Sequence, residues 1–203
     1  MKIKNIITYS TGISLIIIGI IMAIYFQSKY FYAILSVGIL ITFWKIYNST
    51  SEKKLFHNFK KTHHFIFWID LIITSIIIDY IGTRLGYWKG SFMGIEGILK
   101  YPPEWAIPMV STMIIFLIFK KIFQQKGINK YISAIISLTI FVTLFGIGIE
   151  YLNSFGQAWT IQSMPLTNIK IGNYYLIFQT IGFWIIALIP FIEYKLIQKY
   201  LIE

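Results

Sequence analysis

Six apolar runs dominate this chain of 203 residues, and most are long enough to cross the hydrocarbon core of a bilayer, which takes about 20 helical residues. Lipid offers the backbone no hydrogen-bond partner, so a run that crosses it must satisfy its backbone internally, as a helix does. With 57% hydrophobic and 13% charged residues, the chain lacks the charge of a soluble domain. We therefore predict an all-α, polytopic integral membrane protein with about six transmembrane helices. The predicted spans are residues 6–26, 31–47, 65–82, 104–123, 132–152 and 174–194.

The order of these runs predicts a single membrane domain over residues 1–203. Its parts are a helical hairpin (1–47), a cytoplasmic loop (48–63) and a four-helix repeat unit (64–203). The first run is longer than the ~7–15-residue apolar region of a signal peptide. It also ends in Tyr25-Phe26-Gln27 rather than in small residues, so we expect it to be retained as a helix.

The net charge is +10, from 18 Lys and Arg against 8 Asp and Glu. Nucleic-acid binding is one explanation of such a balance, but lysines clustered in particular connections are typical of cytoplasmic loops. With the N-terminus inside, the inner segments hold 13 of the 18 cations and the outer connections hold five. We therefore expect a cell-membrane protein with both termini cytoplasmic, surrounded by membrane lipids and without a nucleic-acid partner. The absence of cysteine excludes disulfides, thiolate metal sites and cysteine nucleophiles.

Acidic residues gather at the outer ends of the predicted helices. Asp79 closes the third helix, Glu104 opens the fourth and Glu150 closes the fifth. Glu96 lies in the connection between the third and fourth helices, with Arg84 as the nearest cation. Ionisable groups at membrane depth are costly and usually have a function. The sequence therefore predicts a site where these acids meet.

The stretch 79–83 resembles the stretch 150–154, at an offset of 71 residues. Over 15 positions this offset gives three identities and three close matches, and it aligns Trp88 with Trp159. Chance similarity in a sequence of low diversity is the alternative. A true repeat relates the third and fourth helices to the fifth and sixth by an axis along the membrane normal, as in some transporters. A binding site then lies between the two pairs, with the two tryptophans as its walls or as interface anchors.

Carboxyl groups beside aromatic walls at membrane depth can serve several kinds of chemistry. A carboxyl group that keeps its proton can donate that proton to an alkene, and aromatic faces stabilise the resulting carbocation. Three or four carboxylates can instead hold Mg²⁺ or Ca²⁺ or form a proton or cation path. As a further alternative, the acids only cap helix ends in the headgroup region. Our candidates are Glu104, Asp79 and Glu150 as catalytic acids and Trp88, Trp159, Arg84 and Glu96 as ligand-binding residues; no metal ligands are assigned and no cofactor is expected.

Asp79, Gly86, Trp88 and the helix-opening Pro102-Pro103-Glu104 resemble the pattern of the lycopene cyclase domain. That family comprises small multi-span carotenoid cyclases whose helices carry a Pro-x-Glu-Glu motif. The resemblance covers about residues 70–125 and matches Glu104 to the first acid of the motif, whereas position 105 is Trp. The same stretch, with the later Trp159 and Pro165, is also similar to a family of small bacterial multi-span membrane proteins of unassigned function.

The cyclase resemblance implies a place in carotenoid or isoprenoid biosynthesis. Together with the acids, it leads us to expect an isomerase that cyclises or isomerises an isoprenoid-like lipid by acid catalysis. The alternative is a non-enzymatic transport, sensing or anchoring subunit that binds a lipid or a cation.

Overall fold

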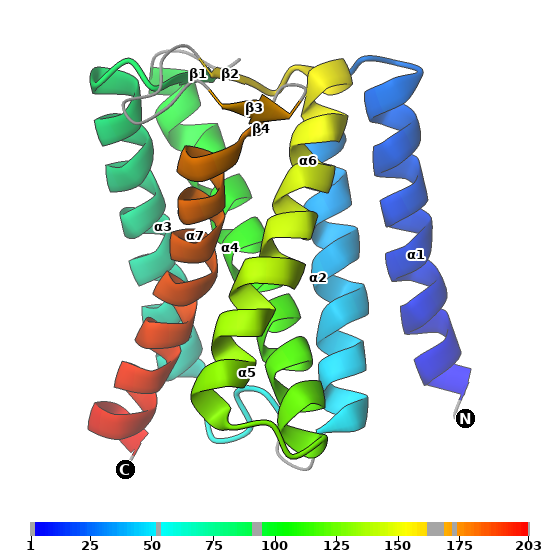
Figure 1. The fold of residues 1–203 in the computed structure, drawn as a ribbon, viewed down its shortest axis with the longest axis vertical. Helices are drawn as coiled ribbons and strands as arrows, with labels where there is room; N and C mark the ends of the chain where they lie inside the picture. Colours follow the sequence, from blue (N-terminus) through cyan, green and yellow to red (C-terminus); the bar gives the residue numbers. More distant parts are fainter. Residues whose placement is uncertain (1–2, 52–53, 91–94, 162–168, 172–173, 203) are drawn as a thin grey trace.

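The computed structural model describes residues 3–51, 54–90, 95–161, 169–171 and 174–202 (Figure 1). For residues 3–6, 88–90, 95–104 and 171 it describes the backbone only. Within this part of the chain, six helices are long and apolar enough to cross a membrane. The protein is an all-α, polytopic membrane protein, and the prediction made from the apolar runs is confirmed.

The first four spans are single helices, and the last two continue through π-helical turns. The first four are α1 (Ile3–Ile24), α2 (Phe31–Thr50), α3 (Lys61–Arg84) and α4 (Ile95–Gln125). The fifth joins α5 (Lys130–Ile136), the π-helix η1 (Ser137–Val142) and α6 (Thr143–Gly156). The sixth joins α7 (Leu176–Ile197) and the π-helix η2 (Gln198–Ile202). Short strands, β1 (Trp88–Gly90), β2 (Trp159–Ile161), β3 (Lys170–Ile171) and β4 (Tyr174–Tyr175), complete the described elements.

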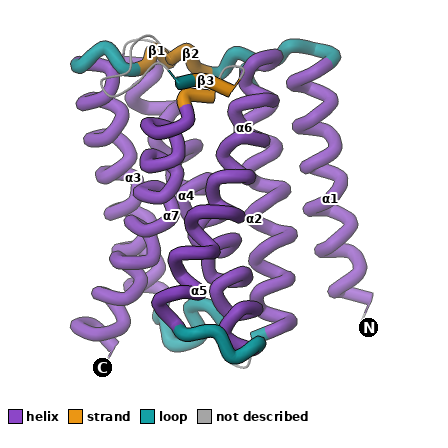
Figure 2. The backbone as a smooth tube through the Cα atoms, viewed as in Figure 1, coloured by secondary structure: helices purple, strands orange, loops and turns teal. Residues whose placement is uncertain are grey.

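The helices stand side by side, with the two termini at one end of the bundle and the strands at the other (Figures 1 and 2). α4 packs against α2, α3 and α7 and against the α5–η1 segment. In its membrane window 61% of the residues are buried, against 39% or fewer in each other span. α4 is therefore the central helix, and the other helices present isoleucine-rich outer faces, as a surface that meets lipid requires.

α1 and α2 approach closely at glycines. A Cβ atom on Gly38 would lie 2.8 Å from the carbonyl oxygen of Gly12, and one on Gly19 would lie 2.8 Å from Cβ of Leu35. Small residues allow this approach between membrane helices. The hairpin then packs through α2 on α4 and through α1 on α6, so it covers one side of the remaining bundle.

The fourth helix begins earlier than the sequence predicts. We expected the chain to enter it through Pro102-Pro103-Glu104, because proline favours the first turn of a helix. Instead α4 begins at Ile95, and both prolines lie inside it. Membrane helices tolerate internal proline because neighbouring groups and local adjustments satisfy the freed carbonyls, and α7 likewise contains Pro190. Glu104 is therefore inside the helix rather than at its start.

The strand pair β1–β2 joins the two halves that the 71-residue offset relates. The offset carries residues 88–90 onto 159–161, which are the observed bounds of the two strands. They pair antiparallel, and Lys89 lies opposite Thr160, its partner under the offset. A two-fold axis along the bundle would produce this antiparallel pairing, and the repeat itself stays a prediction. The same offset carries α3 (61–84) to 132–155, close to the observed fifth span at 130–156.

Candidate functional site

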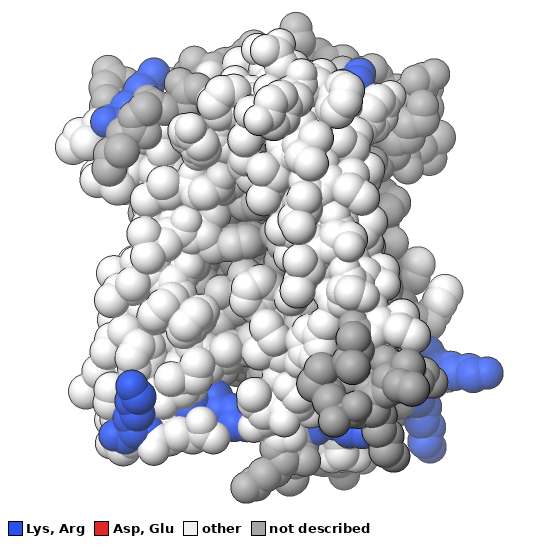
Figure 3. All heavy atoms as spheres, turned by 90° about the vertical axis from the view of Figure 1, so that its right-hand side faces the viewer, with Lys and Arg blue, Asp and Glu red and all other residues white. Residues whose placement is uncertain are grey.

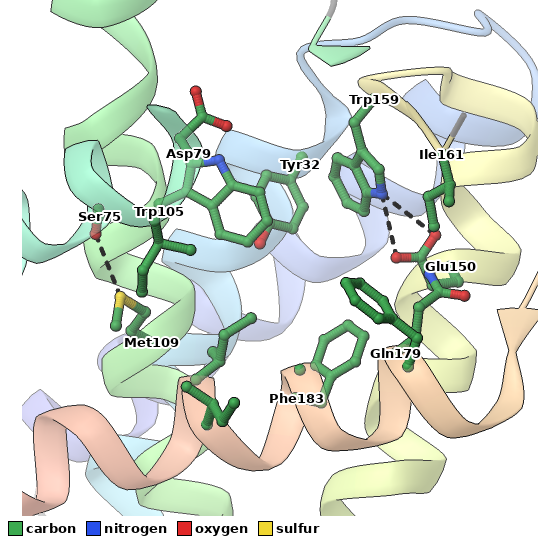
Figure 4. Close-up of a pocket in the computed structure, with 15 residues that line it drawn as sticks. Tyr32, Ser75, Asp79, Trp105, Met109, Glu150, Trp159, Ile161, Gln179 and Phe183 are labelled. Carbon is green, nitrogen blue, oxygen red and sulfur yellow. Dashed lines mark hydrogen bonds between the residues drawn. The ribbon is translucent and has the colours of Figure 1, made fainter. Parts of the chain in front are cut away.

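A cavity of about 290 Å³ lies near the strand end of the bundle, between α3, α4, α6 and α7 (Figure 4). Most of the cavity wall is apolar, and only a few carboxyl, amide and hydroxyl groups line it. Its lining residues are Tyr32, Ser75, Ile78, Asp79, Trp105, Met109, Glu150, Trp159, Ile161, Phe178, Gln179, Gly182, Phe183, Ile185 and Ile186. Cavities that hold small ligands typically measure about 300–1,000 Å³. This one is therefore large enough for the end of a lipid chain rather than for a whole long lipid.

Glu150 is the buried acid of this cavity. Its side chain is only 6% exposed. The indole Nε1–H of Trp159 donates to both carboxyl oxygens, at 3.1 Å to Oε1 and 3.3 Å to Oε2. Because the acid projects from the penultimate turn of α6 and the indole from β2, the turn between them fixes where the carboxyl group points.

Asn153 holds that turn in place. Its Oδ1 accepts hydrogen bonds from the backbone N–H of Ala158 at 2.9 Å and of Trp159 at 3.3 Å. Its Nδ2 donates to the carbonyl oxygen of Trp159 at 2.9 Å. α6 ends at Gly156, and Gln157 takes the left-handed conformation with φ +50°, which reverses the chain. The amide of Asn153 therefore replaces a helical turn and brings Trp159 back over Glu150.

Gln179 stands beside Glu150 on α7 (Figure 4). It is 5% exposed, and its Oε1 accepts from the backbone N–H of Tyr175. Among the described residues, its Nε2 makes no hydrogen bond of full geometry, but it lies close enough to the Glu150 carboxyl group to interact with it. The amide therefore belongs to the polar surroundings of Glu150.

Tyr174 closes the strand end of α7 next to this group. Its hydroxyl shares a hydrogen bond with Oγ1 of Thr180 at 3.0 Å, and the residue is 2% exposed. Burial raises the pKa of the Tyr174 phenol above its ordinary value, and the charge of Glu150 acts in the same direction. Tyr174 therefore stays neutral at physiological pH.

Aromatic rings form the wall on the α2 and α4 side. The ring of Tyr32 lies 4.8 Å from that of Trp159 and 6.0 Å from that of Trp105, both edge to face. The two indole rings are 6.0 Å apart. Phe183 of α7 faces them across the cavity (Figure 4). Such faces carry a negative quadrupole that attracts a cation, so positive charge in this cavity meets aromatic faces on more than one side.

Asp79 lies on the opposite wall from Glu150, on α3 (Figure 4). One turn earlier on the same helix, Ser75 also lines the cavity; its hydroxyl lies 2.6 Å from the carbonyl oxygen of Leu71 and 3.2 Å from Sδ of Met109. The two acids thus face one cavity from helices that the 71-residue offset relates. They do not form a single carboxylate pair.

The cavity reaches the outer surface of the bundle between α3 and α7. Ile185 lines the cavity and is also 47% exposed. On the facing helix, Ile78 and Asp79 line the cavity while the adjacent Ile77 is 51% exposed. The cavity wall therefore meets the outer surface of the bundle at Ile185.

The structure brings together part of the predicted site. Asp79, Glu150 and Trp159 line the one cavity. Arg84 is exposed at the end of α3, where its Nε donates to the hydroxyl of Tyr80 at 3.3 Å, and it is not among the residues that line the cavity. Trp88 lies in β1 and Glu96 and Glu104 lie in α4, but their side chains lie outside the part that the structure describes.

Sequence reasoning missed several residues of the site. Gln179 and Asn153 had a usable signal, because polar side chains within or at the end of an apolar span are costly and tend to be functional. Tyr32 and Trp105 had none, because aromatic residues are also enriched at the membrane interface without a binding role.

The described side chains of the cavity comprise few ionisable groups. Among them, no group of three or more His, Asp or Glu residues could hold a metal ion. What the cavity does offer is one buried carboxyl group, aromatic faces and an apolar wall. Comparison with protein families, with curated proteins and with solved structures finds no match to this chain.

Proposed function

We propose that the cavity binds the end of an isoprenoid-like lipid and that Glu150 donates a proton to a double bond of that lipid. The observation that carries this proposal is the placement of the Glu150 carboxyl group, held by Trp159 in the wall of an otherwise apolar cavity. The opening between α3 and α7 supports entry of the lipid from the membrane. The partial likeness of Pro102-Pro103-Glu104 to the carotenoid cyclase motif supports an isoprenoid as the lipid.

The reaction that this arrangement supports is an isomerisation. The O–H bond of the carboxyl group breaks while the π electrons of the alkene form a new C–H bond, which leaves positive charge on the neighbouring carbon. A second double bond of the same chain closes a ring on that carbon. Loss of an adjacent proton to the carboxylate then restores the acid and a double bond. Atoms and electrons balance without a cofactor, and the rings of Tyr32, Trp105 and Trp159 stabilise the cation.

Binding is tested by filling the cavity. A Cβ atom on Gly182 would meet nothing within 4 Å, and Gly182 lines the cavity. Gly182→Leu is therefore expected to occupy the cavity without straining the helix. Gly148 is the matched control, because its Cβ would also meet nothing within 4 Å and it faces outward on α6. Lipids that copurify with the wild type and Gly148→Leu, identified by mass spectrometry, should be lost from Gly182→Leu; equal retention contradicts the proposal.

A second candidate function is a lipid-binding subunit without catalysis. The same apolar wall and side opening favour it, because neither requires a reaction. A wild-type protein that binds a polyene through the cavity but never converts it would establish this alternative.

We also propose that both termini face the cytoplasm at the cell membrane. They lie at one end of the bundle, and Lys and Arg side chains gather at that end on the face drawn in Figure 3. Basic residues concentrate in cytoplasmic loops of membrane proteins.

A further inference from the structure

A second cavity, of about 330 Å³, lies at the opposite end of the bundle from the first. It opens beside the loop that joins α2 to α3 and the end of α7. Its polar lining differs from that of the first cavity and comprises Tyr47, Lys54, His57, Asn58, Tyr194, Lys195 and Gln198. The proposed lipid reaction uses none of these residues, so this cavity needs an explanation of its own.

The α2–α3 loop is held over this cavity by Phe56. Phe56 is 5% exposed and has φ +60°, a conformation that costs a non-glycine residue free energy. Its ring stacks on Trp44 at 5.3 Å and meets Phe67 at 4.9 Å and Tyr194 at 5.0 Å. Burial among these rings offsets the strained backbone. The neighbouring Lys54 and His57 line the cavity.

The α7 side of the cavity is ordered by hydrogen bonds. Nζ of Lys195 donates to Oε1 of Gln198 at 3.0 Å, and Nε2 of Gln198 donates to the hydroxyl of Tyr194 at 2.7 Å. The amide thus connects the ammonium group to the wall of the cavity. Lys195 therefore lies at the cavity within a short hydrogen-bonded chain that ends at Tyr194.

Among its described lining residues, this cavity carries basic side chains without an acidic one. Lys54 and Lys195 approach it from two different elements. Glu193, the nearby acid on α7, points to a different neighbour and accepts from Oγ1 of Thr74 on α3 at 3.5 Å. Basic pockets between membrane helices at the level of the headgroups are suited to phosphate-bearing headgroups.

From this placement we infer that the second cavity binds a phosphate-bearing anion, with Lys54 and Lys195 as its principal charges and Tyr194 and Gln198 as its wall. The phosphate group is either the headgroup of an anionic phospholipid or part of a soluble compound. The inference is independent of the function proposed for the first cavity.

Native mass spectrometry of the detergent-purified protein tests this site, with phosphatidylglycerol and phosphatidylcholine as probes. The wild type should retain phosphatidylglycerol in preference. Because Lys54 and Lys195 supply the charge inside the cavity, Lys54→Gln with Lys195→Gln should weaken retention about 30-fold, more than removal of two lysines outside it. Lys126→Gln with Lys199→Gln is the control; it removes the same charge at the same end from exposed residues that do not line the cavity.

Competition with millimolar inorganic phosphate distinguishes the two sources. If phosphate displaces the lipid, or if phosphate alone binds in a way that depends on Lys54 and Lys195, the site recognises a phosphate group from either source. Retention of lipid despite phosphate assigns it to the headgroup. The inference is overturned if lipid retention is weakened equally in both double variants or in neither. It is also overturned if the wild type shows no preference between the two lipids and phosphate has no effect. Thermal unfolding checks that the double variants fold. If either double variant does not fold, the single variants Lys195→Gln and Lys199→Gln are compared instead.

Discussion

The indole N–H of Trp159 donates to both carboxyl oxygens of Glu150, at 3.1 and 3.3 Å, across the turn that joins α6 to β2. This contact connects the fold to the proposed chemistry. β2 is paired with β1, so a strand of the outer strand pair also holds the acid at the cavity wall. The geometry of Glu150 therefore depends on the outer strand pair as well as on its own helix.

Removing the indole donor should destabilise the protein. In Trp159→Phe, the buried oxygens of Glu150 lose their donor, and an unsatisfied buried polar group costs about 1–3 kcal/mol. The free energy of unfolding in detergent, from denaturant titration, measures the effect. Trp184→Phe is the control: its Nε1 donates at 3.2 Å to the neutral hydroxyl of Thr143, a bond of about 0.5–1.5 kcal/mol. A larger loss in Trp184→Phe than in Trp159→Phe would speak against a special role of the contact.

Close packing at the end of α6 should make Gly156→Ala destabilising. An added Cβ would lie 2.3 Å from a ring carbon of Phe31, whose side chain is fully buried. Overpacking of this kind typically costs about 1–3 kcal/mol. Gly148→Ala on the same helix meets nothing within 4 Å and should be neutral or stabilising, because alanine favours the helix. Thermal unfolding of the two variants should therefore separate them, and a Gly156→Ala protein as stable as Gly148→Ala refutes the packing argument.

The proposed orientation predicts the readout of reporter fusions. Fusions at Lys126 and after the last residue should be active as cytoplasmic reporters, and fusions at Lys89 and Lys170 should be active as external reporters. The reason is that the α4–α5 turn and the C-terminus lie at the lysine-rich end, whereas both strand pairs lie at the other end (Figure 1). An external signal at Lys126 reverses the orientation and places the acid cavity near the cytoplasm.

The fold could be predicted further than the site. Length and hydropathy are sufficient for the six spans, because a membrane imposes both on any helix that crosses it. They are not sufficient for the start of α4, where proline suggested a helix start but lies inside the helix. Three-residue strands such as β1 and β2 carry too few residues for an alternating pattern, so they could not be predicted from the sequence.

Within the site, acids were predictable because they are costly in lipid, and two of them, Asp79 and Glu150, line the same cavity. The rest of the wall was not predictable. In a chain with 18% aromatic residues, the rings of Tyr32 and Trp105 differ in no visible way from those that face lipid or core. Asn153 acts through the backbone of a turn, and that role depends on a chain reversal that only the structure reveals.

The most direct test of the account is the conversion of an acyclic carotenoid by purified protein in D₂O, with wild type compared with Glu150→Gln. Glutamine keeps the shape of the side chain and can still accept from Trp159, but it has no acidic proton. We predict that both proteins bind the polyene equally and that only the wild type forms a cyclised or isomerised product with deuterium at the new C–H bond. Deuterated product formed by Glu150→Gln at the wild-type rate would contradict the role of Glu150 as the proton donor.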